Sequence, residues 1–154
     1  MKTVNPAHDE YLVIYYSASG NTKKVAEIIN EALTGEGKVS RLFSLPNPVT
    51  DLDIESYKHV FIGSPTYGNG TMPKQVRDLL RYIIKENEYK LPTFSVFGTG
   101  DTQWSSYCRT VDEMTHHLNK KTNVIKTLKM EQYPISDYQI SNIVNFVKES
   151  IGGI

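Results

Sequence analysis

The chain has 154 residues, of which 39% are hydrophobic, so it is long enough to bury the core of one folded domain, expected over 1–154. Its 17 lysine and arginine residues balance 17 aspartate and glutamate residues, so the overall charge points neither to nucleic acid nor to an anionic membrane. No apolar run approaches the roughly 20 residues that span a bilayer, and residues 1–10 are too polar for a signal peptide and are expected to form an N-terminal extension.

The first 57 residues predict two strands around one helix. Residues 11–16, "YLVIYY", are a dense aliphatic and aromatic run, which is typical of a strand buried on both faces. Apolar residues then recur at helical spacing over 21–33, and two glycines end this helix. An alternating pattern over 38–43 predicts an outer strand, and the prolines within 45–57 exclude regular structure there.

The same cycle repeats in the second half. A third strand is expected at 59–64, and Pro73 suits the first position of the helix that follows, because its fixed φ is already helical. Ser136 is a suitable N-cap for a last helix that runs through Ile151. The remaining expected elements are a strand at 93–98, a helix at about 108–119 and a strand at 123–130. This alternation predicts an α/β fold, a parallel five-stranded sheet with helices on both faces.

Three loops stand where such a sheet binds ligands, beyond the carboxyl ends of its strands. They are residues 17–22, 64–72 and 98–107, and all three are rich in glycine, serine, threonine and asparagine. Two of them also carry aromatic residues, Tyr67 in 64–72 and Trp104 with Tyr107 in 98–107. The agreement of the three loops indicates a shared binding site more strongly than any one loop does.

The loop "SASGNT", residues 17–22, has two interpretations. It can be a strand-to-helix turn whose hydroxyls cap the helix. It can also hold a phosphate, since a helix N-terminus offers unpaired N–H groups and the positive end of the helix dipole. No lysine follows a GxxxxG, which excludes a P-loop, and no GxGxxG is present for a dinucleotide.

The three loops together resemble those of flavodoxins. "SASGNT" resembles their FMN phosphate loop, "SPTYGNGTMP" (64–73) their second loop, and "GTGDTQWSSYC" (98–108) their third loop. The resemblance implies a flavodoxin-like, doubly wound sheet of strand order 2-1-3-4-5, and the uninterrupted fifth strand is similar to short-chain members. It further implies an FMN-dependent, low-potential electron carrier, not an enzyme, that cycles between the semiquinone and the hydroquinone.

The resemblance also implies roles for residues. Trp104 would stack coplanar with the flavin ring, and Tyr67 would cover the opposite, inner face. The phosphate would be held in the first loop, and backbone groups of the other two loops would bind the pyrimidine edge and the ribityl chain. The complete set of expected cofactor-binding residues is Ser17, Ala18, Ser19, Gly20, Asn21, Thr22, Pro65, Thr66, Tyr67, Gly68, Asn69, Gly70, Thr99, Gly100, Asp101, Trp104, Tyr107 and Cys108.

The second loop departs from the family pattern in its charge. In flavodoxins the peptide after the loop aromatic flips, so Gly68 is expected to supply the needed backbone freedom, including positive φ. Most flavodoxins carry an acidic residue next, whereas this chain has Asn69 and no charge over 64–73. Less negative charge near the flavin predicts a less negative second reduction potential. It also puts in doubt docking through an acidic face.

Three other functions remain open. The flavodoxin-like activators of class Ib ribonucleotide reductase share S-x-S-G-N-T and a PTYG-type second loop that leads into a PKQV-like helix start. Their third loop usually reads G-N-x-N, whereas this chain has Gly100-Asp101 and the spaced Trp104 and Tyr107. An FMN-dependent NAD(P)H reductase would need a second nucleotide site, for which the sequence shows no feature. A fold that has lost FMN would not need the hydroxyls and aromatics of the loops.

Partners and location follow from the same resemblance. The expected partners are a flavodoxin reductase as electron donor and an electron-accepting enzyme, with the chain itself a monomer. The lone cysteine, Cys108, excludes an internal disulfide, favours a cytoplasmic location and is expected to be mainly a packing residue. His116 and His117 point roughly 100° apart on a helix, so no metal site is expected.

Overall fold

The computed structural model describes residues 10–50, 52–86, 90–103, 106–131 and 136–154, so the expected N-terminal extension and Trp104 lie outside the described residues, apart from Glu10. Five parallel strands form one sheet of order β2-β1-β3-β4-β5, which confirms the predicted topology. The strands are β1 (Tyr11–Tyr15), β2 (Ser40–Ser44), β3 (His59–Pro65), β4 (Thr93–Gly100) and β5 (Val124–Glu131).

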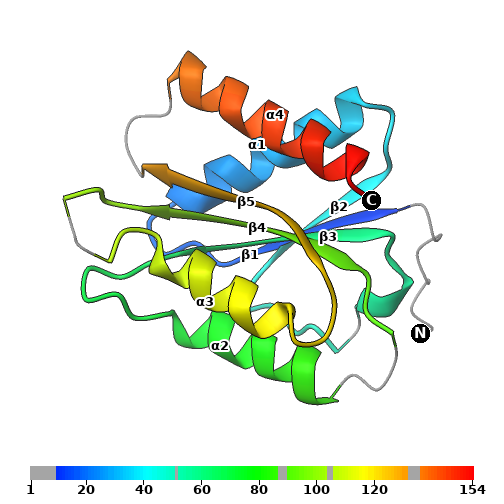
Figure 1. The fold of residues 1–154 in the computed structure, drawn as a ribbon, viewed down its shortest axis with the longest axis horizontal. Coiled ribbons are helices and arrows are strands. Elements are labelled where there is room, and N and C mark those ends of the chain that lie inside the picture. The colour runs from blue at the N-terminus through cyan, green and yellow to red at the C-terminus, as the bar shows by residue number, and fades with distance from the viewer. Residues whose placement is uncertain (1–9, 51, 87–89, 104–105, 132–135) are drawn as a thin grey trace.

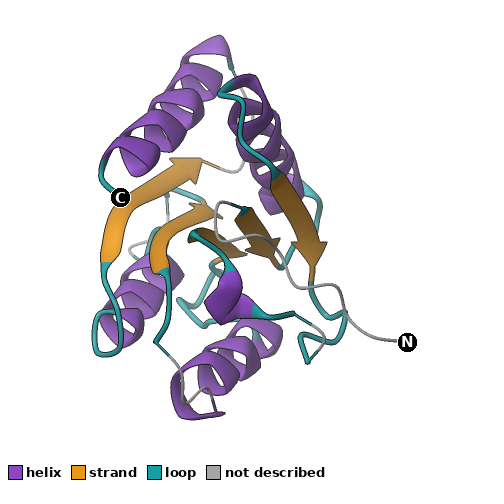
Figure 2. Ribbon diagram, turned by 90° about the vertical axis from the view of Figure 1, so that its right-hand side faces the viewer, coloured by secondary structure: helices purple, strands orange, loops and turns teal. Residues whose placement is uncertain are grey.

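Helices cover both faces of the sheet, as predicted (Figures 1 and 2). One pair, α1 (Asn21–Gly35) and α4 (Asp137–Gly152), lies above the sheet in Figure 1, and the other pair, α2 (Lys74–Arg81) and α3 (Arg109–Leu118), lies below it. Two short segments complete the fold, the 3₁₀ turn η1 (Ile54–Ser56) and the π-helical turn η2 (Tyr82–Glu86), which continues α2. Within the described ranges, no helix is long and apolar enough to cross a bilayer.

Strand β1 contributes to two hydrophobic cores because successive side chains point to opposite faces of a strand. Leu12 and Ile14 join the core beneath α2 and α3, and Val13 and Tyr15 join the core beneath α1 and α4. All four side chains are nearly inaccessible to solvent. The strand is therefore buried on both faces, as its continuous apolar run predicts, and it holds the first loop at the carboxyl edge of the sheet, between β2 and β3.

The outer strand and the segment after it differ from the prediction. β2 begins at Ser40 and ends at Ser44, so the predicted range 38–43 was shifted by one to two residues. The proline-containing segment 45–57 is not wholly irregular, because η1 lies within it and buries Ile54. Pro73 is the N-cap of α2 and not its first helical residue, with ψ of 142°, and its carbonyl accepts hydrogen bonds from Val76 and Arg77.

Strands β3 and β4 run further toward the ligand edge than predicted. Pro65 and Thr99 are paired, and β4 continues to Gly100, so the third loop begins only at Asp101. A side chain at Gly98 would lie 2.4 Å from Val111 Cγ2 and 2.9 Å from the Ser64 carbonyl oxygen. Gly98 therefore allows α3 to pack closely against the sheet. This glycine lies within an extended strand and not in a turn.

Candidate functional site

The three loops meet at the carboxyl edge of the sheet because β1, β3 and β4 are neighbours there. Thr22 Oγ1 and Thr99 Oγ1 are 2.8 Å apart and join the first loop to the end of β4. The N–H of Thr66 donates to the Thr99 carbonyl at 3.1 Å, and Thr66 Oγ1 accepts from the N–H of Thr110 at 3.0 Å. Threonines spaced widely along the chain therefore fix the relative positions of all three loops.

The first loop leaves the start of α1 without a side-chain cap. Its N-cap is Gly20, in the left-handed region with φ of 98°. The Gly20 N–H donates to Ser17 Oγ at 3.0 Å, and Asn21 Nδ2 donates to Ser19 Oγ at 3.1 Å, so these hydroxyls accept bonds within the loop. The capped-turn interpretation is not supported, and the first N–H groups of α1 remain oriented for an anion.

The last helix, α4, has the side-chain cap that α1 lacks. Ser136 Oγ accepts from the Gln139 N–H, and the Gln139 side chain accepts in return from the Ser136 N–H. This complete capping box at α4 confirms the predicted N-cap. The same fold thus caps α4 with a serine and leaves the start of α1 without a side-chain cap, and nothing lies within 4 Å of the Cβ position at Gly20.

The second loop holds Tyr67 with its side chain 40% exposed. The Gly70 N–H donates to the Tyr67 carbonyl at 2.8 Å, and the Asn69 side chain accepts from the Thr71 N–H at 3.0 Å. Partial burial and a hydrogen bond with Tyr16 raise the pKa of Tyr67. Sequence reasoning missed Tyr16, although its position between β1 and the first loop could have indicated contact with the site.

The positive φ in the second loop falls at Gly70, with φ of 81°, and not at Gly68. A side chain at Gly70 would lie 2.9 Å from Ser106 Cβ, so this glycine also allows the second loop to contact the third. Gly68 itself is exposed. The peptide flip expected at Gly68 therefore remains a prediction about a second conformation of the loop.

The third loop is held by two acidic side chains, one of its own and one at the end of β5. Asp101 accepts hydrogen bonds from the Gln103 side chain at 2.7 Å and from the Gln103 N–H at 3.0 Å, and these two bonds, the first foremost, lower the pKa of Asp101. Glu131, at the end of β5, accepts from both the N–H and the hydroxyl of Thr102. Both carboxylates are therefore engaged in shaping the loop.

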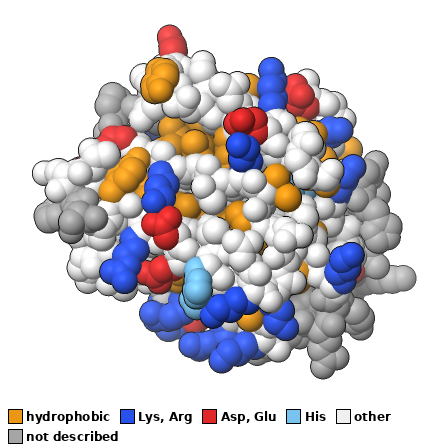
Figure 3. Space-filling model, viewed as in Figure 1, with side chains coloured by type: hydrophobic (Ala, Val, Ile, Leu, Met, Phe, Trp, Pro, Cys, Tyr) orange, Lys and Arg blue, Asp and Glu red, His pale blue; other side chains and the backbone are white. Residues whose placement is uncertain are grey.

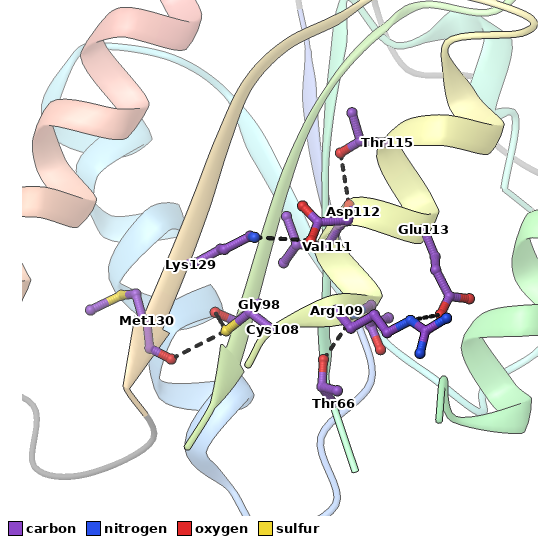
Figure 4. A network of polar contacts seen from close by, with 11 residues as sticks. Thr66, Gly98, Cys108, Arg109, Val111, Asp112, Glu113, Thr115, Lys129 and Met130 are labelled. Atoms are coloured by element: carbon purple, nitrogen blue, oxygen red, sulfur yellow. Dashed lines mark hydrogen bonds and ion pairs between the residues drawn. The ribbon is translucent and has the colours of Figure 1, made fainter. Parts of the chain in front are cut away.

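Cys108 lies beneath this loop at the start of α3 (Figure 4). It is fully buried, with φ of 49°, and its thiol lies 3.7 Å from the Gly98 carbonyl oxygen and 3.6 Å from that of Met130. Burial raises the pKa of Cys108 to about 11, so the thiol stays protonated and unreactive at neutral pH. The expected packing role of this cysteine is confirmed.

A small cavity of about 10 Å³ lies between the second and third loops. Its lining brings together Thr66, Tyr67, Gly100, Asp101, Tyr107 and Cys108, all expected site residues, with Ser106. A side chain at Gly100 would lie 3.0 Å from the Cys108 nitrogen, so glycine is needed for this close approach. Trp104, the expected stacking residue, lies outside the described residues, so the wall that it would form is not described.

Thr110, in the first turn of α3, carries a buried hydroxyl that has no hydrogen-bond partner among the described residues. We expect Thr110→Val to stabilise the protein by about 1 kcal/mol, because valine has the same shape and removes an unsatisfied polar atom. Thr115→Val is the matched control on the same helix, since Thr115 Oγ1 donates to the Val111 carbonyl at 2.7 Å. Urea unfolding should show a gain for the first variant and none for the second; a loss at Thr110 would contradict the prediction.

The family model for flavodoxins matches residues 13–132, which is more than half of the chain. This chain belongs to the flavodoxin family. Among its flavodoxin relatives, probable flavodoxin 2 of Bacillus subtilis is 28% identical over 141 residues, which covers 90% of this chain and 91% of the relative. The flavodoxin of Maridesulfovibrio salexigens is 31% identical over 134 residues, covering 84% and 91%.

Solved flavodoxin structures agree with the fold. A flavodoxin of Streptococcus pneumoniae TIGR4 superposes with a TM-score of 0.84 at 18% identity, covering 94% of this chain and 99% of that one. The family match favours the flavodoxin interpretation of the three loops over the ribonucleotide reductase activator.

Proposed function

We propose that this chain binds FMN at the three loops and carries electrons one at a time between redox proteins. The observation that carries the proposal is the open start of α1, where Gly20 is left-handed and no side chain caps the helix. The second loop adds uncharged hydrogen-bonding residues and the aromatic side chain of Tyr67. When bound, FMN supplies one-electron chemistry that protein side chains lack.

The residues of the first loop would hold the phosphate. Backbone N–H groups at the start of α1 face the anion, and the helix dipole favours its charge. Ser17 and Ser19 are already oriented by hydrogen bonds from Gly20 and Asn21, which reduces the entropy lost on binding. Thr22 is buried and bonded to Thr99, so it ties this anion site to the end of β4.

The residues around the ring would exclude water and set the electrostatic environment. Tyr67, held by Tyr16, presents a partly exposed aromatic surface of the kind that a flavin ring covers. The second loop offers Asn69 where an acidic side chain would raise the energy of an added negative charge. This supports a second reduction potential less negative than in acidic members of the family.

Partners, location and assembly remain part of the proposal. An electron-transfer role without a catalytic side-chain constellation is supported by the flavodoxin family itself. The single cysteine supports a cytoplasmic location, and a reductase as donor and an enzyme as acceptor are what the family resemblance implies. We infer a monomer that forms short-lived complexes with both.

Replacing Trp104 by alanine is expected to weaken FMN retention far more than replacing Tyr107. A flavin ring that loses its stacking partner loses on the order of 1 kcal/mol beyond the buried area. Tyr107 is half-buried against the loop base, where burial raises the pKa of its hydroxyl, and it would not stack. The measurement is the dissociation constant of FMN, from the quenching of its fluorescence by apoprotein. Equal losses of FMN affinity in the two variants would show that Trp104 does not stack on the flavin ring.

A further inference from the structure

A groove runs between α2 and α3, next to the second loop, with a volume of about 490 Å³. Its inner surface includes Met72 and Leu80, both largely buried, together with Ile84. Asn69 and Gly70 of the second loop close one end. We refer to this feature as the α2–α3 groove; of its lining, the proposed binding of FMN uses only Asn69 and Gly70 of the second loop.

Cations dominate the rim of the α2–α3 groove. Arg77, Arg81, Lys85 and Arg109 line it, whereas its lining includes a single carboxylate, that of Glu113. Glu113 already pairs with Arg109, whose Nε lies 3.3 Å from Glu113 Oε1 (Figure 4). Because the whole chain has no net charge, this excess is local to one face.

Three of these cations form no close ion pair in the described part of the chain. The ion pairs found there do not include Arg77, Arg81 or Lys85. The nearby carboxylate of Asp78 forms its ion pair with Lys74, at 3.0 Å, and the more distant charges of Arg81 and Arg77 add to lowering its pKa. In Figure 3, lysine and arginine side chains gather along the lower part of the molecule, where α2 and α3 lie. Uncompensated exposed charges of one sign attract a partner of the other sign.

The groove is continuous with the loops expected at the flavin. Gly70 lines the groove, and a Cβ built at this glycine would lie 2.9 Å from Ser106 Cβ of the third loop and 3.4 Å from Arg109 Cδ. Tyr67 is three residues earlier and accepts the Gly70 N–H at its carbonyl. A partner that occupies the groove would therefore lie beside the two loops through which electrons would leave.

We propose that the α2–α3 groove docks an acidic segment of the redox partner, with one or two apolar side chains of that segment on the Met72 and Leu80 surface. This deepens the proposed function, on which it rests, by naming the chemistry of the partner. Charge complementarity selects the occupant, since two copies of this chain paired groove to groove would bring cations against cations. The partner would thus carry the acidic surface, the reverse of the docking expected for acidic flavodoxins.

The first test needs no flavin. A fluorescein-labelled oligoglutamate peptide containing two leucines is titrated with the full chain, with and without FMN, and its fluorescence anisotropy is followed. Wild-type protein should bind it, and the double variant R77E/R81E should bind about tenfold or more weakly. The control K58E/K148E changes the charge equally at exposed lysines, before β3 and on α4, and should bind as the wild type does.

Two results would overturn the proposal in this assay. One is equal loss of binding in R77E/R81E and K58E/K148E, which would indicate attraction to overall charge alone. The other is stoichiometric binding of inorganic tripolyphosphate that displaces the peptide at lower concentration, which would make the groove a site for small polyanions. A concentration-dependent dimer of wild type lost in R77E/R81E would assign the groove to a second copy instead.

The second test separates docking from the proposed function. The FMN-loaded, reduced protein gives one electron to each molecule of ferricyanide, a small anionic oxidant, and the rate is followed by stopped flow. Added salt should slow the wild type and K58E/K148E, and should not slow R77E/R81E. If the protein takes up no FMN, the proposed function fails, and the peptide assay still tests the groove. If the FMN-loaded protein reduces ferricyanide at a rate that does not depend on the charges of Arg77 and Arg81, the docking proposal is overturned.

Discussion

Gly20→Ala is expected to weaken FMN binding by about tenfold to a hundredfold, because it disturbs the backbone N–H groups that would face the phosphate. Gly20 has φ of 98°, a conformation in which an L-residue costs about 1–2 kcal/mol. Nothing lies within 4 Å of the position of its Cβ, so backbone strain and the approach of the ligand are the only effects. The measurement is the FMN dissociation constant of the purified variant.

Gly37→Ala is the matched control for this prediction. Gly37 follows the other end of α1, has φ of 75°, and also has nothing within 4 Å of its Cβ position. Both variants should lose a similar amount of unfolding free energy in urea, and only Gly20→Ala should lose FMN affinity. If both lose affinity equally, the first loop is not the phosphate site and general destabilisation explains the effect.

The stability of the protein is expected to fall steeply as the pH drops below about 6.5, because His59 is buried in its neutral form. Its Nε2 lies 2.7 Å from Ser95 Oγ and its Nδ1 lies 2.7 Å from Thr93 Oγ1. Ser95 Oγ donates to Ser150 Oγ, which donates to the Phe146 carbonyl. Ser95 is therefore free to accept from Nε2–H, and Thr93 can donate to Nδ1.

Burial lowers the pKa of His59 to about 3, so between pH 6.5 and 3 the unfolded chain binds a proton that the folded chain refuses. The unfolding free energy should therefore fall by about 1.4 kcal/mol for each pH unit across this window and stay constant above it. Urea unfolding at a series of pH values measures this slope. Carboxylates that form ion pairs in the folded state lower the unfolding free energy further only toward the acidic end of this pH window.

His59→Gln is expected to flatten this acid limb whatever it costs at neutral pH, since glutamine cannot take the proton. His116→Gln removes an exposed imidazole from α3 and should retain the full slope, because His59 is intact. The readout is the slope of the unfolding free energy against pH and not the absolute stability. A general loss of packing in the His59 variant would lower the stability at every pH and would not flatten this slope. An unchanged slope in His59→Gln would show that other groups cause the acid sensitivity.

Local pattern was sufficient to predict the layered fold. The apolar run at 11–16, the helical spacing at 21–33 and the alternation of strands and helices each reflect burial that adjacent residues share. The strand order was confirmed together with the resemblance that implied it. The capping box at Ser136 was also predictable, because both of its hydrogen bonds lie within three residues.

Contacts between distant segments could not be predicted in this way. The predicted strand ends at Gly98 and Gly100 reads as a loop residue, yet β4 continues to Gly100, and both glycines allow the start of α3 to approach the sheet closely. Tyr16 became part of the site only through its bond with Tyr67. The cations of the α2–α3 groove are spread over two helices in the sequence, and only the packing of those helices gathers them on one face.

The anaerobic reductive titration of the FMN-loaded protein, followed by visible absorption, tests the central claim most directly. We expect a yellow protein that accepts electrons in two separate steps, with a long-wavelength band of the one-electron-reduced form growing and then fading. A single two-electron step without that band would contradict a one-electron carrier and favour a reductase. A colourless protein that refuses added FMN would contradict the proposed site itself.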